Sequence, residues 1–433
     1  MYLRKCKYSG KKLVCFSLSK HKYVFKSLKI KDIKLIKVHN FPKTSLFKFI
    51  YRFNIFLWYL SLFDFWKKNN INKKYSYKFS ALNDKWKIIF RWLIALKAQR
   101  FFTRIDNLLF SKCGVVLSYL LKNQCKLVIV PGSAMDTSSF LAIRTAKKLN
   151  IPSVMAVMHW DFFSKKGILR AKPDYLLVWG RAMEKSAVAQ GISRKRILKV
   201  GFPCFDLSRN SLSKFNINQT ITMLFAGAGV TFDEVGAIKI ITSILAGMNI
   251  RTRLTYRPHP RGSTTMKFKE IEKKTTMVEI KCAIPNAREN EFMATKKLLR
   301  KCNAVITPAS TMILEAGSHG VPSLCLAYDD GVNDKVFPFS YAMESEHIKS
   351  VQRNPYIIFC RQKTDLNEKV NELINLIRKA PDPWEIRRSF SDVLENAGTV
   401  PSRILVNRAL KKIIATTKNT GKDSFNELSC NHN

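Results

Sequence analysis

NAVITPASTMILEAGSHGVPSLCLAYDD, residues 303–330, is the stretch that decides the fold. Its first apolar run, Ala304–Ile306, is typical of a buried parallel strand. A helical pattern follows over Met312–Ser318, and a second apolar run follows over Val321–Leu326. The stretch therefore predicts a strand, a helix and a second parallel strand, the unit from which open α/β sheets are built.

Two hydroxyl residues, Ser310 and Thr311, stand just before the predicted helix and favour an N-cap there. Because this helix begins at the carboxyl end of a sheet, its backbone N–H groups, its dipole and the two hydroxyls would together suit an anion. Glu315 lies one turn further on the same helix face as Thr311, within reach of a polar group beside that anion. A nucleotide presents a phosphate and a sugar hydroxyl in this arrangement. An ordinary βαβ unit with a capped helix explains the same residues.

The length of 433 residues and the 46% of apolar residues predict two packed domains. Alternating strands and helices predict two Rossmann-like, doubly wound parallel sheets, one in residues 1–206 and one in residues 220–417. The polar segment 207–219 is typical of a linker. Strands are expected near 126–130, 152–157, 173–180 and 197–201, and helices near 365–379 and 402–416 are expected to close the second domain. Residues 418–433 are expected to form a tail.

The first 120 residues are basic and aromatic. The chain has 75 Lys and Arg against 31 Asp and Glu, a net charge of +44, and residues 1–100 contain 25 of the basic and 3 of the acidic side chains. Such a charge attracts polyanions, meaning nucleic acid or an anionic membrane surface. Residues 1–45 alternate Lys with apolar residues, which fits strands or basic amphipathic segments.

Two segments, 46–66 and 86–110, combine Trp and Phe with Lys and Arg. The uninterrupted apolar core of the first, Ile55–Phe63, is too short to span a bilayer. The composition fits a helix lying in the membrane interface, where each Lys adds roughly 1 kcal/mol of attraction to an anionic leaflet. A helix buried in the N-terminal domain explains the same composition.

The ten cysteines include no CxxC pair, and several lie within apolar runs, as free buried thiols do. This pattern favours a reducing compartment and supports neither a zinc site nor a disulfide framework. The N-terminal segment lacks the pattern of a signal peptide. We therefore expect a cytoplasmic protein without a metal or a cofactor.

Gly227-Ala228-Gly229 follows the predicted strand Thr222–Ala226. The GxGxxG pattern is incomplete, because Phe232 stands where the third glycine would be. Small residues at this place would let a ligand approach the backbone N–H groups at the start of the next helix. A tight turn has the same composition.

Arg257-Pro258-His259-Pro260-Arg261 begins where another predicted strand ends. The two prolines fix the backbone, which leaves Arg257 and His259 pre-positioned. A guanidinium and an imidazole together suit a diphosphate, and each charge-assisted hydrogen bond contributes roughly 1.5–3 kcal/mol.

His159-Trp160-Asp161, also at the end of a predicted strand, supplies the acid/base candidates of the first domain. Asp161 or His159 could deprotonate an acceptor hydroxyl, and Asp161 could equally cap the next helix. Asp329-Asp330-Gly331 raises the possibility of a metal site, but an acidic pair before glycine favours a turn.

Together these motifs resemble the GT-B fold glycosyltransferases of bacterial surface polysaccharide assembly (lipopolysaccharide and capsule), over roughly residues 125–410. That group's donor-binding segment, Ser-Thr-x-x-x-Glu-Ala followed by Gly-x-Pro, is matched here by Ser310-Thr311, Glu315-Ala316 and Gly320-Val321-Pro322. Pro258-His259-Pro260 is similar to the segment that contacts the donor phosphates. First-domain features of the group resemble Pro173-Asp174 through Trp179-Gly180, Gly201-Phe202-Pro203 with Asp206, and Trp160-Asp161 with Lys166-Gly167. Phe162 and Phe163 depart from the polar residues expected there.

The resemblance implies two domains facing a cleft, with a nucleotide-sugar donor on the second domain and Glu315 on its ribose. It implies a metal-independent glycosyltransferase that moves the sugar to a lipid-linked or growing glycan acceptor on the first domain. The donor diphosphate would be stabilised by Arg257, His259 and the Ser310-Thr311 helix start, near Gly227 and Gly229. Such an enzyme would be peripheral at the inner face of the cytoplasmic membrane.

Two other enzymes resemble the same donor site. One is a glycerophosphotransferase that uses CDP-glycerol, and the other is a nucleotide-sugar 2-epimerase, which needs several carboxylates near the sugar. From a different class, the basic N-terminus would suit an RNA-binding protein. That class predicts aromatic stacking modules that the sequence lacks, so no nucleic acid partner is expected.

Overall fold

A computed structural model gives the fold of residues 13–17, 33–37, 53, 56, 59, 60, 83–96, 101, 104, 120, 121, 125, 127–132, 137–166, 169, 171–206, 220–229, 231–248, 250–259, 273–274, 278–282, 291–333, 338–398 and 400–420. The predicted linker 207–219, much of the basic aromatic region and residues 421–433 lie outside these described residues. The chain divides into two units, residues 1–204 with 400–433 and residues 205–399.

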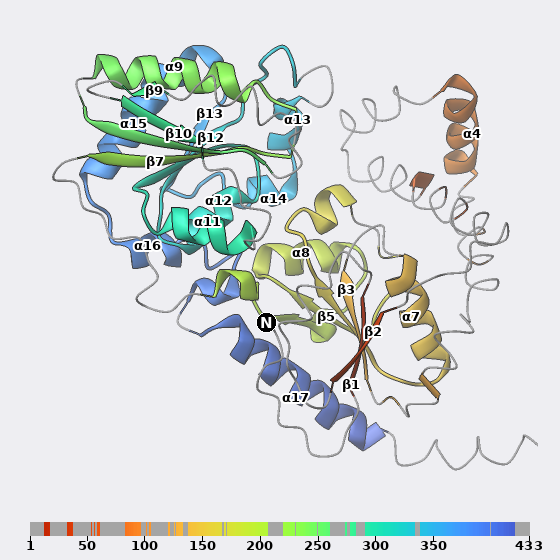
Figure 1. Ribbon diagram of the computed structural model, residues 1–433. Helices are drawn as coiled ribbons and strands as arrows, with labels where there is room; N and C mark the ends of the chain where they lie inside the picture. Colours follow the sequence, from red (N-terminus) through yellow and green to blue (C-terminus); the bar gives the residue numbers. More distant parts are fainter. Residues whose placement is uncertain are drawn as a thin grey trace, which may run out of the picture. The chain divides into compact units, whose positions relative to one another are not determined.

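The first unit is a parallel sheet with the strand order β2-β1-β3-β4-β5-β6 (Figure 1). Its strands are β1 (Leu13–Ser17), β2 (Ile33–Lys37), β3 (Val128–Gly132), β4 (Ser153–Val157), β5 (Tyr175–Val178) and β6 (Ile197–Lys199). Its helices include α4 (Asp84–Ala95), α7 (Thr137–Lys148), α8 (Arg181–Ala189) and α17 (Ser402–Thr420). The strands expected from residue 126 onward are present, and the basic first 45 residues add two more strands to the same sheet.

The helix predicted near 402–416 exists as α17, but its expected place in the second domain is wrong. Val406, Leu410 and Ile413 of α17 are buried against Ile129 and Leu177 of the first sheet. An amphipathic helix can cover any apolar sheet face, so its sequence does not specify which of the two sheets it covers.

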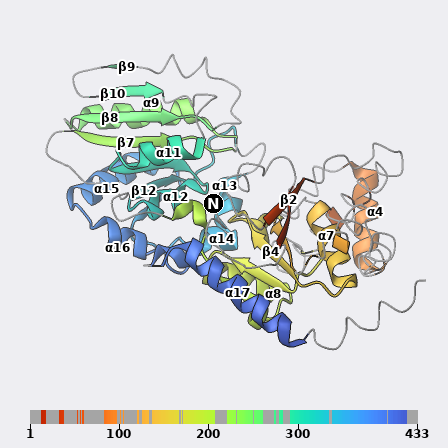
Figure 2. The ribbon, with the colours of Figure 1, turned by 60° about the horizontal axis from the view of Figure 1, so that its bottom comes forward.

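The second unit is a sheet with the strand order β13-β12-β11-β7-β8-β10-β9 (Figure 2), parallel except for the antiparallel pair of β9 and β10. Its strands are β7 (Ile221–Ala226), β8 (Thr252–Arg257), β9 (Lys273–Lys274), β10 (Val278–Cys282), β11 (Ala304–Pro308), β12 (Ser323–Leu326) and β13 (Ile357–Cys360). Its helices include α9 (Glu234–Gly247), α11 (Glu291–Leu299), α12 (Met312–Ser318), α13 (Phe339–Met343), α14 (Glu346–Lys349), α15 (Leu366–Arg378) and α16 (Pro383–Arg388). The prediction of two parallel-sheet α/β domains is confirmed.

Short helical turns complete the described elements. They are η2 (Phe162–Lys166), η3 (Arg194–Arg196), η4 (Pro203–Phe205), η6 (Lys363–Asp365) and η7 (Glu395–Ala397).

Helices cover both faces of the second sheet, and successive side chains of each strand point to opposite faces. Met223 and Phe225 of β7 belong to one buried cluster with side chains of α9 and α15. Leu224 and Ala226 belong to a second cluster with side chains of α11 and α12. The near-continuous apolar runs seen in the sequence follow from this burial on two sides.

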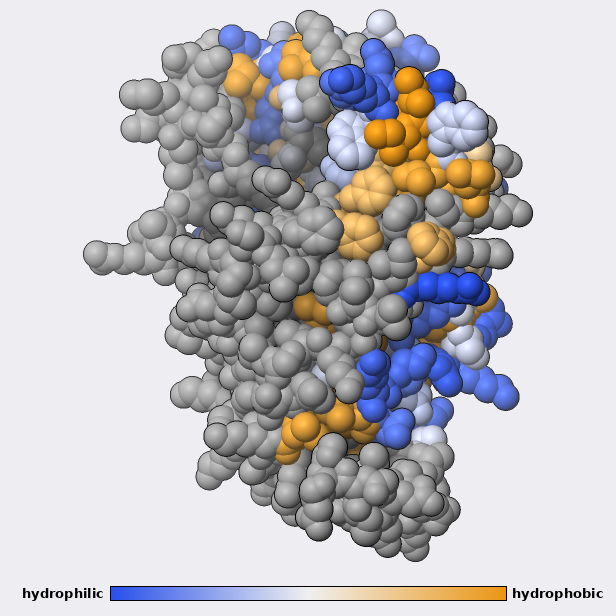
Figure 3. Space-filling model, turned by 90° about the vertical axis from the view of Figure 1, so that its right-hand side faces the viewer, coloured by the Kyte–Doolittle hydropathy of each residue, from blue (hydrophilic) through white to orange (hydrophobic). Residues whose placement is uncertain are grey.

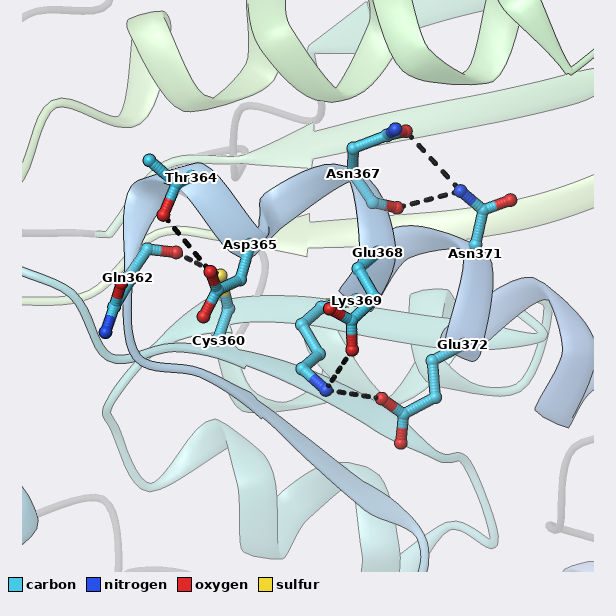
Figure 4. Close-up of polar contacts among 9 residues, drawn as sticks. All are labelled: Cys360, Gln362, Thr364, Asp365, Asn367, Glu368, Lys369, Asn371 and Glu372. Carbon is cyan, nitrogen blue, oxygen red and sulfur yellow. Dashed lines mark hydrogen bonds and ion pairs between the residues drawn. The ribbon is translucent and has the colours of Figure 1, made fainter.

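Helix α15 is a surface helix whose polar contacts are shown in Figure 4. Leu366, Val370 and Leu373 lie in the core. On the polar side Lys369 contacts the carboxylates of Glu368 at 2.9 Å and Glu372 at 3.0 Å (Figure 4). The helix is therefore apolar on one side and polar on the other, as its 3.6-residue periodicity requires.

In the part of the chain that the structure describes, no helix combines the length and the apolarity needed to cross a membrane.

Leu410→Ala is expected to destabilise the first unit by roughly 2–5 kcal/mol, because it opens a cavity between α17 and the first sheet. Hydrogen exchange with mass spectrometry is the measurement. Peptides of β3, β4 and β5 should lose protection, while peptides of β7 and β11 should keep it. Lys411→Ala, on the exposed side of the same helix, is the matched control. An equal loss of protection in β7 and β11 would contradict the assignment of α17 to the first unit.

Candidate functional site

The second sheet reverses its strand order at β7. From β7 the chain proceeds to β8 and β10 on one side, and then crosses to β11, β12 and β13 on the other. In open α/β sheets, ligands bind at the carboxyl ends of strands where the order reverses in this way. Residues 227–229, 257–259 and 307–311 come directly after the neighbouring strands β7, β8 and β11 or include their last residues. The structure therefore brings the segments predicted to bind the donor to one edge of one sheet.

The start of α12 is capped by one of the two predicted hydroxyls. The Ser310 Oγ lies 3.3 Å from the Met312 backbone N–H that donates to it, and 3.0 Å from the Thr307 Oγ1. Thr311 is exposed and occupies the N-cap position, but its side chain makes no capping hydrogen bond. The Ser310 hydroxyl therefore already has two partners within the protein, and Thr311 is exposed.

Glu315 is the most unusual side chain at this edge. The residue is only partly exposed, and its Oε1 is buried with no hydrogen-bond partner. Burial raises the pKa of the Glu315 carboxyl from 4.5 to about 7, while the positive charges of Arg257 and Lys296 act in the opposite direction. A buried acceptor without a donor costs about 1–3 kcal/mol, and a ligand hydroxyl would remove that cost.

Two cations lie close enough to Glu315 to influence its pKa. Arg257 is the last residue of β8 and is 8% exposed, and Lys296 on α11 is 7% exposed. Buried cations are uncommon unless paired. Lys296 was missed by the sequence analysis, since its neighbour Lys297 has the same side chain and is exposed.

Gly227 leaves room for the Glu234 carboxylate. A Cβ at this position would lie 2.6 Å from the Glu234 Oε2. The Gly227 N–H donates to the Arg257 carbonyl oxygen at 2.8 Å, and the Ala228 N–H donates to the Glu234 Oε1 at 2.9 Å. These two N–H groups therefore already have partners, and the predicted role of Gly227 in donor binding stays a prediction.

Gly229 and His259 lie against each other. A Cβ on Gly229 would come within 2.9 Å of the His259 Cε1 and 3.0 Å of its Nε2. The glycine thus leaves room for the imidazole, which is partly exposed. Two motifs that are 30 residues apart in the sequence meet at this contact, as expected for segments that follow adjacent parallel strands.

Glu234 and Tyr256 form a second polar group that the sequence analysis missed. The Tyr256 hydroxyl, which is buried, donates to the Glu234 carboxylate, and burial raises the pKa of that carboxyl. Glu234 is the first residue of α9, where a carboxylate is favoured by the helix dipole. The pair fixes the loop after β7 to β8.

The carboxyl end of α12 is held by Arg387, whose side chain is 3% exposed. Its guanidinium donates to the carbonyl oxygens of Ser318, Asn396 and Phe205, the last at 3.2 Å. A cation bonded to the last carbonyls of a helix is favoured by the helix dipole. Arg387 therefore helps to hold the helix that carries Glu315.

His319 ends α12 as a neutral, fully buried imidazole. Its Nδ1 lies 2.8 Å from the Glu315 carbonyl oxygen, so the Nδ1–H is the donor. Burial lowers the pKa of His319 to about 3. The next residue, Gly320, has φ +72°, and a Cβ there would overlap Pro383, so only glycine fits this helix end.

Asp329 and Asp330 lie in a bent loop, where the Asp330 carboxylate accepts from the backbone N–H two residues on, as in an Asx turn. Asp330 accepts hydrogen bonds from the backbone N–H groups of Asp233, Val332 and Asn333 at 2.6–2.8 Å. Asp329 accepts from the N–H of Phe339 at 2.5 Å. These carboxylates connect loops of the second unit. Among the described residues, no group of three His, Cys, Asp or Glu side chains could hold a metal ion.

In the first unit, His159 and Asp161 follow β4 at the carboxyl end of its sheet. Both are partly exposed, and Trp160 between them is buried. Phe162 and Phe163 begin the π-helical turn η2, and both are buried with their ring centroids 4.9 Å apart. Packing thus accounts for the two phenylalanines that departed from the expected polar pattern.

Other first-unit features from the sequence have structural roles. The Trp179 Nε1–H donates to the Val157 carbonyl oxygen at 2.8 Å and fixes the end of β4. The Asp174 carboxylate accepts from the backbone N–H and the hydroxyl of Ser153 at the amino ends of β5 and β4. Asp174 is therefore at the opposite edge of the sheet from Asp161.

No family model matches the chain, and no curated protein matches it. Among matching solved structures, a UDP-GlcNAc 2-epimerase from Methanocaldococcus jannaschii is 14% identical with a TM-score of 0.49, over 93% of this chain and 99% of the epimerase. The lipopolysaccharide outer core galactosyltransferase WaaB is 16% identical with a TM-score of 0.43, over 73% of this chain and 82% of WaaB. The wall teichoic acid polymerase TagF, with CDPG, is 13% identical with a TM-score of 0.42, over 68% of this chain and 73% of TagF.

A galactosyltransferase and a nucleotide-sugar epimerase are among the enzyme classes predicted from the motifs. Identities of 13–16% and TM-scores of 0.42–0.49 carry no argument about activity.

Glu315→Gln is expected to change how stability depends on pH. Between about pH 4.5, where the unfolded carboxyl titrates, and about pH 7, the folded protein retains a proton that the unfolded chain has released. The free energy of unfolding of the wild-type protein should therefore fall as pH rises through this window, by up to roughly 3 kcal/mol relative to the Gln variant.

Urea unfolding of both proteins from about pH 4 to about pH 8 measures this difference, because the subtraction removes the titration of other groups. Glu372→Gln, which changes a half-exposed carboxylate of α15, is the control for the loss of one carboxylate elsewhere in the same unit. Parallel curves for wild type and Glu315→Gln would show that the Glu315 pKa is not raised.

Proposed function

We propose that this protein is a glycosyltransferase that moves a sugar from a nucleotide-sugar donor to a lipid-linked or growing surface glycan. The observation that carries the proposal is the buried Glu315 Oε1, which lacks a hydrogen-bond partner at the edge where the second sheet reverses its strand order. A carboxylate in this position accepts hydrogen bonds from vicinal hydroxyls, the groups of a ribose.

The charges around Glu315 support a donor with a diphosphate. Arg257 and Lys296 are both buried and both act on the Glu315 carboxyl, and the imidazole of His259 lies after the same strand as Arg257. Arg257 and His259, which lie at this edge, would stabilise the negative charge that develops on a nucleoside diphosphate as the glycosidic bond to the sugar breaks. In this assignment, Ser310 and Thr311 lie beside the phosphates, and the transfer needs no metal.

In the proposed reaction, Asp161 or His159 accepts the proton of the acceptor hydroxyl as its oxygen bonds to the anomeric carbon. The nucleoside diphosphate leaves with the electron pair of the broken bond. Surface polysaccharides such as lipopolysaccharide or capsule are the proposed products. We place the enzyme in the cytoplasm, peripheral at the inner face of the cytoplasmic membrane.

One observation favours this transferase over a 2-epimerase. Of the described carboxylates on the first unit's sheet and α8, Asp174 is bonded to Ser153 at the opposite edge and Glu184 is 3.7 Å from Arg194. Asp161 directly follows β4, and the Asp206 carboxylate, after β6, accepts a hydrogen bond from the Asn396 side chain at 2.7 Å. A glycerophosphotransferase that uses CDP-glycerol remains the second candidate, since the same cations would stabilise its leaving group.

Thermal shift with UDP-, GDP-, CDP- and TDP-sugars and with CDP-glycerol is expected to identify one donor that raises the melting temperature. A ligand at about 100 times its Kd stabilises the folded state by about 2.7 kcal/mol. Glu315→Ala should remove most of this shift while the free protein stays folded, and Glu372→Gln should retain it. A wild-type shift and wild-type turnover in Glu315→Ala would refute the donor site.

Asp161→Asn and His159→Gln separate catalysis from donor binding. If one of the two side chains is the base, its variant should turn over at least about 100-fold more slowly, with the donor-induced thermal shift unchanged. Glu184→Gln is the control in the same unit. The products identify the class: free nucleoside diphosphate with an extended glycan indicates glycosyl transfer, CMP indicates glycerophosphate transfer, and an isomerised donor without acceptor indicates epimerisation.

A further inference from the structure

Helix α4 is anchored through one side. Phe90 and Ile94 are 4% and 6% exposed. The Phe90 ring stacks on Phe56 with the centroids 5.4 Å apart, and Trp86 packs against the same Phe56 at 6.2 Å. This inner side already supplies the apolar stripe that a surface helix needs.

The opposite side of α4 is apolar as well. Ile88, Trp92 and Leu96 follow one another at intervals of four residues and are 57%, 66% and 69% exposed, and Ile89 beside them is 42% exposed. At 100° per residue these four positions lie opposite Phe90 and Ile94. Together these four residues form the outer face of α4.

The outer side of α15, another surface helix of this protein, is polar. The outer side of α15 carries Glu368, Lys369 and Glu372 in a network of ion pairs (Figure 4). The outer side of α4 is therefore unlike that of α15, where the exposed side chains are charged.

Two basic side chains lie on or beside the outer face. Lys85 lies within it in the helical projection, and Arg91 is exposed at its edge. The acidic residue of the helix, Asp84, is 2.7 Å from Lys87. Figure 3, drawn from the side on which α4 lies in Figure 1, shows hydrophobic and pale aromatic residues at the surface beside blue, charged ones.

We propose that the outer face of α4 docks on an anionic phospholipid bilayer, with Ile88, Ile89, Trp92 and Leu96 inserted below the headgroups. The helix has 12 residues, so it is about 18 Å long, too short to cross a bilayer but long enough to lie in its interface. The tryptophan and the aliphatic side chains would enter the interface, and Lys85 and Arg91 would face anionic headgroups.

The chemistry of the outer face favours lipid over other occupants. Nucleic acid would use the cations and the tryptophan but would leave three aliphatic side chains without a role. A stable dimer buries at least about 1,000 Å² in total, more than four side chains on a short helix supply. The proposal extends the proposed function by naming how the enzyme reaches a lipid-linked acceptor, and it can be tested without donor or acceptor.

Co-sedimentation of the full chain with vesicles is the experiment, using phosphatidylcholine alone and phosphatidylcholine mixed with phosphatidylglycerol. The wild-type protein should bind the anionic vesicles, and high salt should weaken that binding. The double variant Trp92→Ser/Leu96→Ser should bind at least about tenfold more weakly, because two large apolar side chains no longer leave water. Lys85→Glu should weaken binding only at low salt.

Val188→Ser and Ile404→Ser, which change exposed apolar residues on α8 and α17, are matched controls and should bind as the wild type does. Circular dichroism and the thermal shift with donor establish that the double variant is folded and still binds nucleotide. If no donor raises the melting temperature of the wild-type protein, the proposed function is refuted. The vesicle measurement still tests the docking proposal in that case.

Three outcomes would overturn the docking proposal. One is wild-type protein that does not bind anionic vesicles, and another is equal binding by the double variant. The third is a wild-type dimer that the double variant converts to a monomer in light scattering, which would assign the outer face to a second copy of the chain.

Discussion

The pairing of β7 with β8 on one side and β11 on the other is the constraint on which the second unit depends. Alternating residues of β7 enter two buried clusters, so the strand is covered on both faces. Its hydrogen bonds and apolar contacts therefore hold it at the centre of the sheet. Because the chain crosses from β10 to β11 past this strand, segments more than 70 residues apart end at the same edge. The candidate site follows from the order of the strands before any single side chain is considered.

Holding Glu315 at that edge requires support from elsewhere. Helix α12 has seven residues, too few for a helix that is stable alone in water. Ser310 caps its start, Arg387 donates to the carbonyl oxygen of its last residue, Ser318, and Gly317 allows the ring of Phe390 to approach closely. The surrounding contacts thus fix a helix that carries a buried carboxyl oxygen without a donor. The buried oxygen without a donor costs free energy, and the packing around the helix offsets that cost. This pattern is expected when a group is positioned for a ligand.

The sequence specified the strands well, because parallel strands buried on two sides appear as uninterrupted apolar runs such as Met223–Ala226. It also specified the motifs that follow those strands, but it did not specify which side chains contact these motifs. Lys296 and Lys297 are identical in type, and only tertiary packing buries the first. Glu234, Tyr256 and Arg387 likewise acquire their roles from contacts with distant residues. The placement of α17 failed for the same reason, since one apolar helix face fits either sheet equally well.

Helix α4 illustrates a pattern that periodicity alone does not explain. Apolar residues surround most of its circumference, which is typical of a helix buried on all sides or in contact with lipid. Phe90 and Ile94 account for one side, and four exposed apolar side chains remain on the other. Complete burial of a fully exposed side chain of this size contributes roughly 1.5–3 kcal/mol. Because 42–69% of each of these side chains is exposed, removing one from water would contribute roughly half of that, still more than a typical exposed ion pair contributes. The nearby cations act at longer range and are screened by salt. Charge would therefore bring α4 to an anionic surface, and its apolar outer face would hold it there.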